Sequence, residues 1–171
     1  MIGQANAQVA HPDRLFIGGR WIPVEGSGRF TVTNPATEEV FGEVVAAGVP
    51  EVERAVAAAR KAFDEGPWPR MSAAERASYM RALSQALQRR GAALDSAWIS
   101  QVGVPIWMAQ GSGAGTAGLL DYYAGLAETY PFEDVRPSNG MMSKVAVVVR
   151  EPVGVVAAIA PWTGPLASLL I

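Results

Sequence analysis

Three glycines in the middle of the chain have a spacing that could bind a nucleotide phosphate. Gly113, Gly115 and Gly118 lie in the stretch GSGAGTAG and match the G-x-G-x-x-G pattern of dinucleotide-binding turns. That pattern binds pyrophosphate where a strand ends and a helix begins, because the helix N-terminus then faces the phosphate. The preceding residues, PIWMAQ, make a poor buried strand. The context therefore favours a packing segment of small residues at the start of a helix.

A second candidate site lies in residues 151–171. Val153–Ala160 is an almost continuous apolar run, which predicts a strand buried on both faces, as in a parallel sheet. The rigid turn Pro161–Pro165 follows, and then Ala167–Ile171 resembles the opening of a helix. Sheets of this kind bind ligands at the carboxyl ends of their strands. We therefore expect a cofactor to approach this turn.

Other common kinds of catalytic site are hard to build from this sequence. It contains no cysteine, which excludes disulfides, thiolate metal sites and cysteine nucleophiles within these residues. A usual zinc site cannot be assembled from the one histidine, His11, so we predict no metal. A Ser-His-Asp triad would also depend on His11, which lies near a terminus that would hold a base poorly.

Charge and hydropathy narrow the classes of partner. The formal net charge is −2 and charges of both signs are mixed, so we expect neither nucleic acid nor a membrane surface as a partner. The first residues lack the positive and apolar regions of a secretory signal. No apolar run reaches the roughly 20 residues that span a bilayer. These features predict a soluble cytoplasmic protein.

Local signals outline the elements that must position the two candidate sites. Gly18-Gly19 predicts a tight hairpin between Leu15–Ile17 and Arg20–Ile22. Further strands are expected at Phe30–Thr33, Val40–Ala46, Phe132–Arg136 and Met142–Arg150, the last two joined by a turn at Pro137–Gly140.

Three helices are also expected. Pro50 fits the first position of one helix, and Ser72 with Glu75 forms a capping box that begins a second. The second helix continues, with a break near Gly91, until Gly103 and Pro105. A third covers Leu119–Thr129. Trp98 and Trp107 are predicted to be packing residues, because large aromatic side chains mostly provide buried area.

These stretches, in this order, resemble the N-terminal part of an NAD(P)-dependent aldehyde dehydrogenase. The matching segments are FIGGRWIP, TNPAT, VERAVAAARKAF, the helix after SAAER, LLDYYAGLAE and REPVGVVAAIAPW. The last is the most specific. The resemblance implies an α/β fold: an incomplete aldehyde-dehydrogenase-like fold that has a Rossmann-like cofactor domain, an N-terminal β-hairpin and an oligomerisation hairpin.

The resemblance also implies boundaries. Residues 1–14 would be a flexible N-terminus, and 15–131 the N-terminal part of the cofactor-binding domain. Residues 132–150 would be the hairpin through which family members join subunits, so a homo-oligomer is expected. Residues 151–171 would be the first Rossmann-like strand and the start of the next helix.

The implied activity is oxidation of an aldehyde to a carboxylic acid with NAD or NADP. In the family a cysteine thiolate attacks the aldehyde, and a glutamate-activated water hydrolyses the resulting thioester. Ile159, Ala160, Pro161 and Trp162 inherit the cofactor-lining role. The family places its cysteine and general base after the point where this sequence stops. We therefore expect an N-terminal fragment that is inactive alone.

Two residues depart from the family's pattern. Thr163 stands where the family usually has an asparagine whose amide helps to hold the oxyanion. The threonine hydroxyl is a donor with a shorter reach, and loss of one oxyanion donor costs roughly 2.7–4 kcal/mol of transition-state stabilisation. Gly164 replaces a residue that is often aromatic, which removes a wall of the site.

Two alternatives stay open at this point. The chain could be a non-catalytic, dehydrogenase-like assembly module that uses its hairpin, with the apolar edge of Val153–Ala160 free to pair with another chain. It could instead be a stand-alone dinucleotide binder that uses GAGTAG. The sequence identifies neither the aldehyde nor the choice between NAD and NADP.

Overall fold

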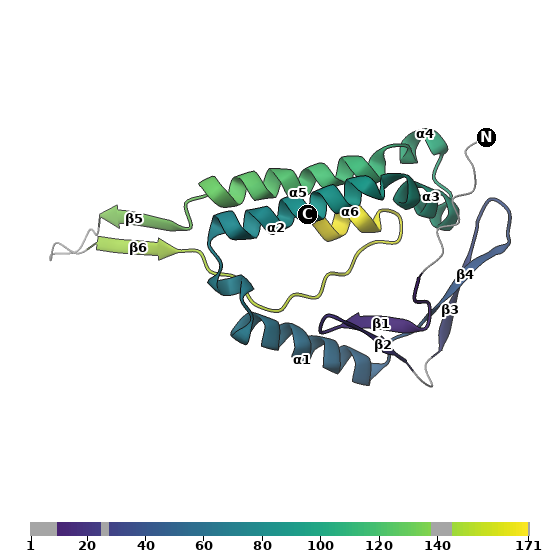
Figure 1. Cartoon of the computed structure of the whole chain (residues 1–171), viewed down its shortest axis with the longest axis horizontal. Coiled ribbons are helices and arrows are strands. Elements are labelled where there is room, and N and C mark those ends of the chain that lie inside the picture. Colours follow the sequence, from purple (N-terminus) through teal and green to yellow (C-terminus); the bar gives the residue numbers. More distant parts are fainter. Residues whose placement is uncertain (1–9, 25–27, 138–144, 171) are drawn as a thin grey trace.

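A computed structural model describes residues 10–24, 28–137 and 145–170 of the chain. Short strands and longer helices make up a mixed α/β fold, as the sequence predicts (Figure 1). In chain order the elements are β1 (Arg14–Ile17), β2 (Arg20–Pro23), β3 (Arg29–Thr33), β4 (Val40–Val45), α1 (Val49–Glu65), η1 (Trp68–Arg70), α2 (Ala73–Arg89), α3 (Gly91–Val102), α4 (Ile106–Ala109), α5 (Ser112–Thr129), β5 (Glu133–Pro137), β6 (Val145–Val149) and α6 (Pro165–Leu170). Of the helices in these ranges, none has both the length and the apolar character that a membrane crossing requires.

The strands of the described ranges form antiparallel pairs, β1 with β2, β3 with β4 and β5 with β6. The first pair confirms the predicted hairpin. Gly18 and Gly19 have φ angles of 59° and 78°, a left-handed conformation that glycine adopts without steric penalty. Residues 1–9 of the expected flexible N-terminus lie outside the described ranges, and β1 already begins at Arg14.

The first two helices begin within one residue of the predicted positions, α1 at Val49 and α2 at Ala73 after its N-cap Ser72. The Glu51 carboxylate accepts a hydrogen bond from the Gly48 N–H at 2.9 Å, which lowers the pKa of Glu51. At α2, the Glu75 N–H donates to Ser72 Oγ at 3.2 Å, and the Ser72 N–H donates to Glu75 Oε2 at 2.8 Å. This reciprocal capping lowers the pKa of Glu75. Local capping chemistry therefore determines both helix starts.

The predicted break near Gly91 divides the long second helix into α2 and α3. Helix α3 ends at Gly103, whose φ of 77° is the left-handed conformation of a helix C-cap. The two tryptophans of this region differ. Trp98 is partly buried on α3, but Trp107 on α4 is 76% exposed, so its predicted packing role is wrong. A one-turn helix at the surface has too few neighbours to cover an indole.

The core lies between α2 and α5, which run antiparallel side by side (Figure 1). The buried positions of this pair are mainly small: Ala77, Ser84, Gly113, Ala117, Leu120 and Ala124. Small side chains let the two backbones approach closely. Ser84 is the buried polar residue among them, and its hydroxyl donates to Asp121 Oδ2 at 2.9 Å. The buried hydroxyl is therefore satisfied across the helix interface.

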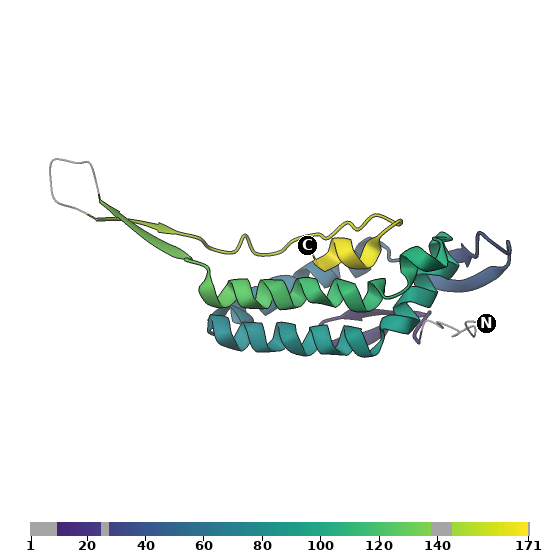
Figure 2. The same cartoon turned by 90° about the horizontal axis from the view of Figure 1, so that it is seen from above.

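The hairpin of β5 and β6 extends away from the helices (Figure 2). The expected strands 132–136 and 142–150 are thus present in shortened form, while most of the predicted turn lies outside the described residues. Valine side chains on both faces of the hairpin remain exposed, namely Val135, Val145, Val147, Val148 and Val149. The hairpin therefore buries little apolar area within this chain.

The strand predicted for Val153–Ala160 is not formed. These residues have no regular secondary structure, and Val153 and Ile159 are each 93% exposed. The physical reason is pairing, because a strand exists only through the backbone hydrogen bonds of a neighbouring strand. Within the described ranges, the adjacent strand β6 pairs with β5, and no strand pairs with residues 153–160. No parallel sheet is present in these ranges either.

Candidate functional site

The turn after Ala160 is a compact, locally stabilised structure. The Gly164 N–H donates to the Pro161 carbonyl, and α6 then begins at Pro165. Both the N–H and the hydroxyl of Ser168 donate to the Gly164 carbonyl, the hydroxyl at 2.9 Å. Proline is favoured at the first position of a helix, since it has no N–H to leave unpaired. The chain thus changes from an irregular stretch to a helix within a few residues.

Trp98 connects this turn to the helical core. Its indole Nε1–H donates to the Thr163 carbonyl oxygen at 2.8 Å, across 65 positions of sequence. The bond fixes the backbone of the turn relative to α3. No local pattern predicts it, because either residue alone is compatible with many partners.

The residues predicted to line a cofactor are mostly accessible. Ile159 and Trp162 are 93% and 64% exposed, Pro161 is also exposed, and Ala160 is partly buried. Thr163 is exposed, and its hydroxyl has no hydrogen-bond partner among the described residues. The five predicted site residues are thus consecutive in the chain, and all of them except Ala160 are exposed.

A cavity of about 260 Å³ lies directly beside this turn. It is lined by α3, by the first turns of α5 and by the start of α6, and it is partly open to solvent. Its lining residues are Leu94, Ala97, Trp98, Gln101, Val102, Ser112, Gly113, Thr116, Gly164, Pro165, Leu166 and Ala167. This cavity could not be predicted from the sequence, because residues of three separate elements line it.

The glycine motif lies inside α5, which confirms that it is a packing segment at a helix start. Asp95 on α3 occupies the N-terminus of this helix: its carboxylate accepts from the N–H groups of Gly111 and Gly113, each at 2.7 Å. A Cβ at Gly113 would lie 2.8 Å from the Gly91 carbonyl oxygen and 2.9 Å from Leu94 Cβ. The amide groups that would bind a pyrophosphate are therefore already bound to a carboxylate. An acidic residue within an apolar helix was the signal for this cap.

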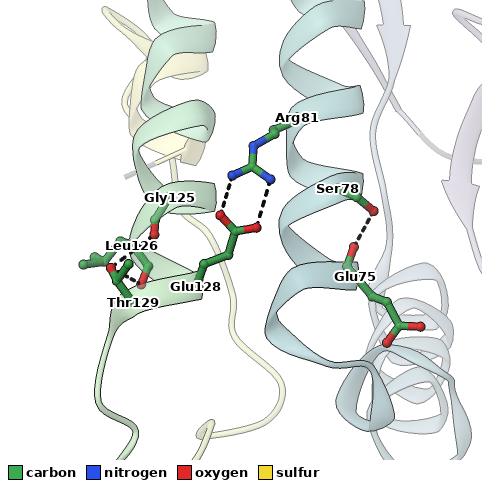
Figure 3. A network of polar contacts seen from close by, with 7 residues as sticks. All are labelled: Glu75, Ser78, Arg81, Gly125, Leu126, Glu128 and Thr129. Atoms are coloured by element: carbon green, nitrogen blue, oxygen red, sulfur yellow. Dashed lines mark hydrogen bonds and ion pairs between the residues drawn. The ribbon is translucent and has the colours of Figure 1, made fainter.

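The ion pair in Figure 3 stabilises the helices rather than the turn. Arg81 on α2 donates to both carboxylate oxygens of Glu128 on α5, at 3.1 and 2.6 Å. These hydrogen bonds lower the pKa of Glu128 and raise that of Arg81. Two parallel bonds orient the pair more strictly than a single contact would. The pair therefore aligns α2 with α5.

The remaining candidates do not form a site. His11 lies against Trp21, with ring centroids 4.4 Å apart. In the part of the chain that the structure describes, no group of three or more histidine, aspartate or glutamate side chains could hold a metal ion.

Comparison with known proteins identifies the family. Residues 21–171 match the aldehyde dehydrogenase family, and the chain belongs to it. It is 40% identical over 154 residues to the geranial dehydrogenase of Castellaniella defragrans, covering 90% of this chain and 32% of that protein. It is 38% identical over 156 residues to betaine aldehyde dehydrogenase 1 of Oryza sativa subsp. japonica, covering 89% and 31%.

Solved structures agree. The Mycobacterium tuberculosis aldehyde dehydrogenase in complex with NAD+ superimposes with a TM-score of 0.83 and 36% identity, covering 92% of this chain and 32% of that one. The NAD-dependent aldehyde dehydrogenase of Sinorhizobium meliloti gives a TM-score of 0.84 and 32% identity, covering 99% and 34%. The chain thus spans about a third of the length of these relatives.

Proposed function

We propose that this chain takes part in the oxidation of an aldehyde to a carboxylic acid with NAD or NADP. In this function residues 15–131 are the N-terminal part of a cofactor-binding domain, and Ile159, Ala160, Pro161 and Trp162 line the cofactor. The observation that carries the proposal is the turn after Ala160, which Trp98 anchors while Trp162 stays accessible. Support comes from relatives of the same fold, one of which binds NAD+.

The residues of the turn suit one part of such a cofactor. Residues 152–170 contain no charged side chain, while Ile159 and Trp162 offer exposed apolar area. They would therefore contact an uncharged ring or ribose rather than the phosphates, whose partners must lie elsewhere. When bound, NAD+ supplies the acceptor for the hydride that leaves the aldehyde carbon.

Thr163 is proposed to contact the substrate oxygen. The Thr163 carbonyl accepts the hydrogen bond from Trp98. The Thr163 hydroxyl has no partner among the described residues, so it can donate to a substrate oxygen. A donor aimed at an oxygen that gains negative charge stabilises the transition state, provided the donor is held in place beforehand. The hydrogen bond from Trp98 gives the backbone of this residue that fixed position.

We further propose that the 171 residues alone do not catalyse the reaction. The chemistry requires a strongly nucleophilic thiolate, and the chain has no cysteine. The test is to incubate the purified chain with hexanal and either NAD+ or NADP+ and to follow absorbance of the reduced cofactor. We expect no increase above buffer. Any aldehyde-dependent turnover would show that this proposal is wrong.

A chimaera tests the positive part of the proposal. Residues 21–171 would replace the matching segment of the Mycobacterium tuberculosis aldehyde dehydrogenase, which supplies the rest of the enzyme. We expect the chimaera to oxidise aldehydes with NAD+. Thr163→Asn should raise kcat, because the longer amide reaches the oxyanion better, and Thr163→Ala should lower kcat. The kcat values of these two variants should differ by up to roughly 100-fold.

Thr129→Ala, at the far end of α5, is the matched control and should leave kcat unchanged. A folded chimaera that binds NAD+ but oxidises no aldehyde, with either Thr163 or asparagine at this position, would refute the proposed function. Equal kcat values for all three residues at position 163 would remove Thr163 from the site but would leave the family reaction in place.

A second proposal concerns residues 132–150, which we infer to join copies of this chain into a homo-oligomer. The hairpin extends from the helices and leaves its valines exposed, as an interface element would (Figure 2). The same role is expected if the chain is an assembly module without catalytic activity.

The hairpin proposal is tested with Val147→Glu, which places a charge in the inferred interface. Val147 is 53% exposed, and Val56 on α1, at 51%, gives the matched control Val56→Glu. Light scattering after size exclusion should show a defined oligomer that Val147→Glu dissociates and Val56→Glu does not. Polydisperse aggregates, or equal behaviour of the two variants, would contradict the proposal.

A further inference from the structure

The cavity beside the turn owes its space to small residues. Ala97 and Ala167 face it from α3 and α6, and Gly113 and Gly164 contribute no side chain. A side chain at Gly164 would begin in open space, with nothing within 4 Å of its Cβ. An apolar cavity of about 150 Å³ holds benzene, so a cavity of about 260 Å³ has room for a molecule of up to roughly ten non-hydrogen atoms. The volume fits a small organic molecule rather than a peptide.

The polar groups around the cavity are mostly bound to the protein itself. The Ser112 hydroxyl donates to Asp95 Oδ1 at 3.3 Å, and the Thr116 hydroxyl donates to the Ser112 carbonyl at 2.7 Å. The indole N–H of Trp98 is held by Thr163. The amide of Gln101 is the polar side-chain group left without a partner among the described residues.

No charged side chain lines the cavity. A cationic guest would lose its hydration without meeting a carboxylate, which makes its burial unfavourable. A neutral apolar guest loses nothing of this kind and gains from burial against Leu94, Val102 and Leu166. Charge and lining therefore select for uncharged apolar molecules that carry at most one polar group.

We infer that this cavity binds the uncharged, apolar chain of the substrate, which makes the substrate class an apolar aldehyde of up to roughly ten non-hydrogen atoms rather than a cationic one. The inference that the guest is a substrate rests on the proposed function, whereas the selectivity of the cavity for apolar molecules does not.

The test measures binding to the 171-residue chain itself. The probes are 1-octanol, which has an apolar chain of the right size and cannot react, and choline, a cation of similar bulk. The readout is the indole N–H signal of Trp98 in ¹⁵N–¹H spectra, assigned by its loss in Trp98→Phe. We expect 1-octanol to shift this signal saturably and choline to leave it unchanged.

Variants that fill the cavity sharpen the test. Ala167→Leu and Thr116→Leu add volume from α6 and α5, and each should weaken 1-octanol binding by roughly tenfold or more. Gly118→Leu is the matched control: it lies on α5, lines no part of the cavity and has open space around its Cβ, so binding should not change.

Each outcome has a defined meaning. Absence of a saturable 1-octanol shift, equal or tighter choline binding, or undiminished binding in both filled variants would overturn the inference. None of these results would affect the proposed reaction, which the chimaera tests separately. If 1-octanol binds selectively but the chimaera is inactive, the selectivity of the cavity for apolar molecules is supported and the enzymatic role is refuted.

Discussion

The helix pair α2–α5 and the stretch 151–160 differ in how far their apolar residues are buried. On the helices, Ala77, Ala117 and Ala124 are completely buried, whereas Val153 and Ile159, both more hydrophobic, are each 93% exposed. Helices satisfy their backbone hydrogen bonds internally and need only a face to pack against. A strand needs a neighbouring strand before its side chains can be buried. Burial here follows the availability of a backbone partner rather than hydropathy.

The turn at Pro161–Pro165 lies between these two regions. It follows the exposed stretch, yet Trp98 ties it to the helical part of the chain through the Thr163 carbonyl. The backbone of Thr163, which is proposed to contact the substrate, is therefore held by α3, although the preceding residues form no strand.

The largest effect is expected from Gly113→Val, which tests how tightly the helices pack. Its Cβ would lie 2.8 Å from the Gly91 carbonyl oxygen, and such overpacking costs roughly 1–3 kcal/mol. Gly115→Val, two positions away, meets nothing within 4 Å and is the control. Urea unfolding followed by circular dichroism should show a clearly lower free energy of unfolding for Gly113→Val but not for Gly115→Val. Equal losses would mean that the glycines matter through backbone freedom rather than packing.

A smaller, local effect is expected from Trp98→Phe, which removes the donor to Thr163. A hydrogen bond of this kind contributes about 0.5–1.5 kcal/mol. Amide exchange at Gly164 and Ser168 should accelerate, while protection within α2 stays unchanged. Trp107→Phe, at a position that is 76% exposed, should change neither. Unaltered exchange in the turn after loss of the Trp98 indole would show that the turn holds itself in place.

The smallest effect concerns the ion pair of Arg81 and Glu128. Hydrogen bonds from Arg81 hold the pKa of Glu128 below its ordinary value of 4.5. A carboxyl with a lowered pKa in the folded state contributes stability above the unfolded-state pKa and loses it as pH falls through the folded value. The stability difference between wild type and Glu128→Gln should thus be present at pH 7 and shrink below pH 4.5. Glu65→Gln, on α1, controls for a general loss of charge; a pH-independent difference for Glu128→Gln would rule out this linkage.

Much of the local structure was predictable because its causes lie close together in sequence. Pro50, the capping pair Ser72 and Glu75, and the turn at Gly18-Gly19 each act within a few residues, and their elements begin where expected. The third helix was predicted to begin at Leu119 but begins at Ser112. The glycine segment was expected at a helix start, but the helix boundary was placed seven positions too late because glycine-rich sequence argues against a helix, while the Asp95 cap that stabilises this one comes from α3.

The family, the helix starts, the tight hairpin and the position of the turn from Ile159 to Thr163 could be predicted from the sequence, since they depend on residue identity and short-range geometry. The structure was needed to find which apolar residues are buried, where Asp95 and Trp98 bind, and that a cavity lies beside Gly164. Those features arise where separate elements meet, and contacts across 65 positions of sequence leave no local pattern by which they could be predicted.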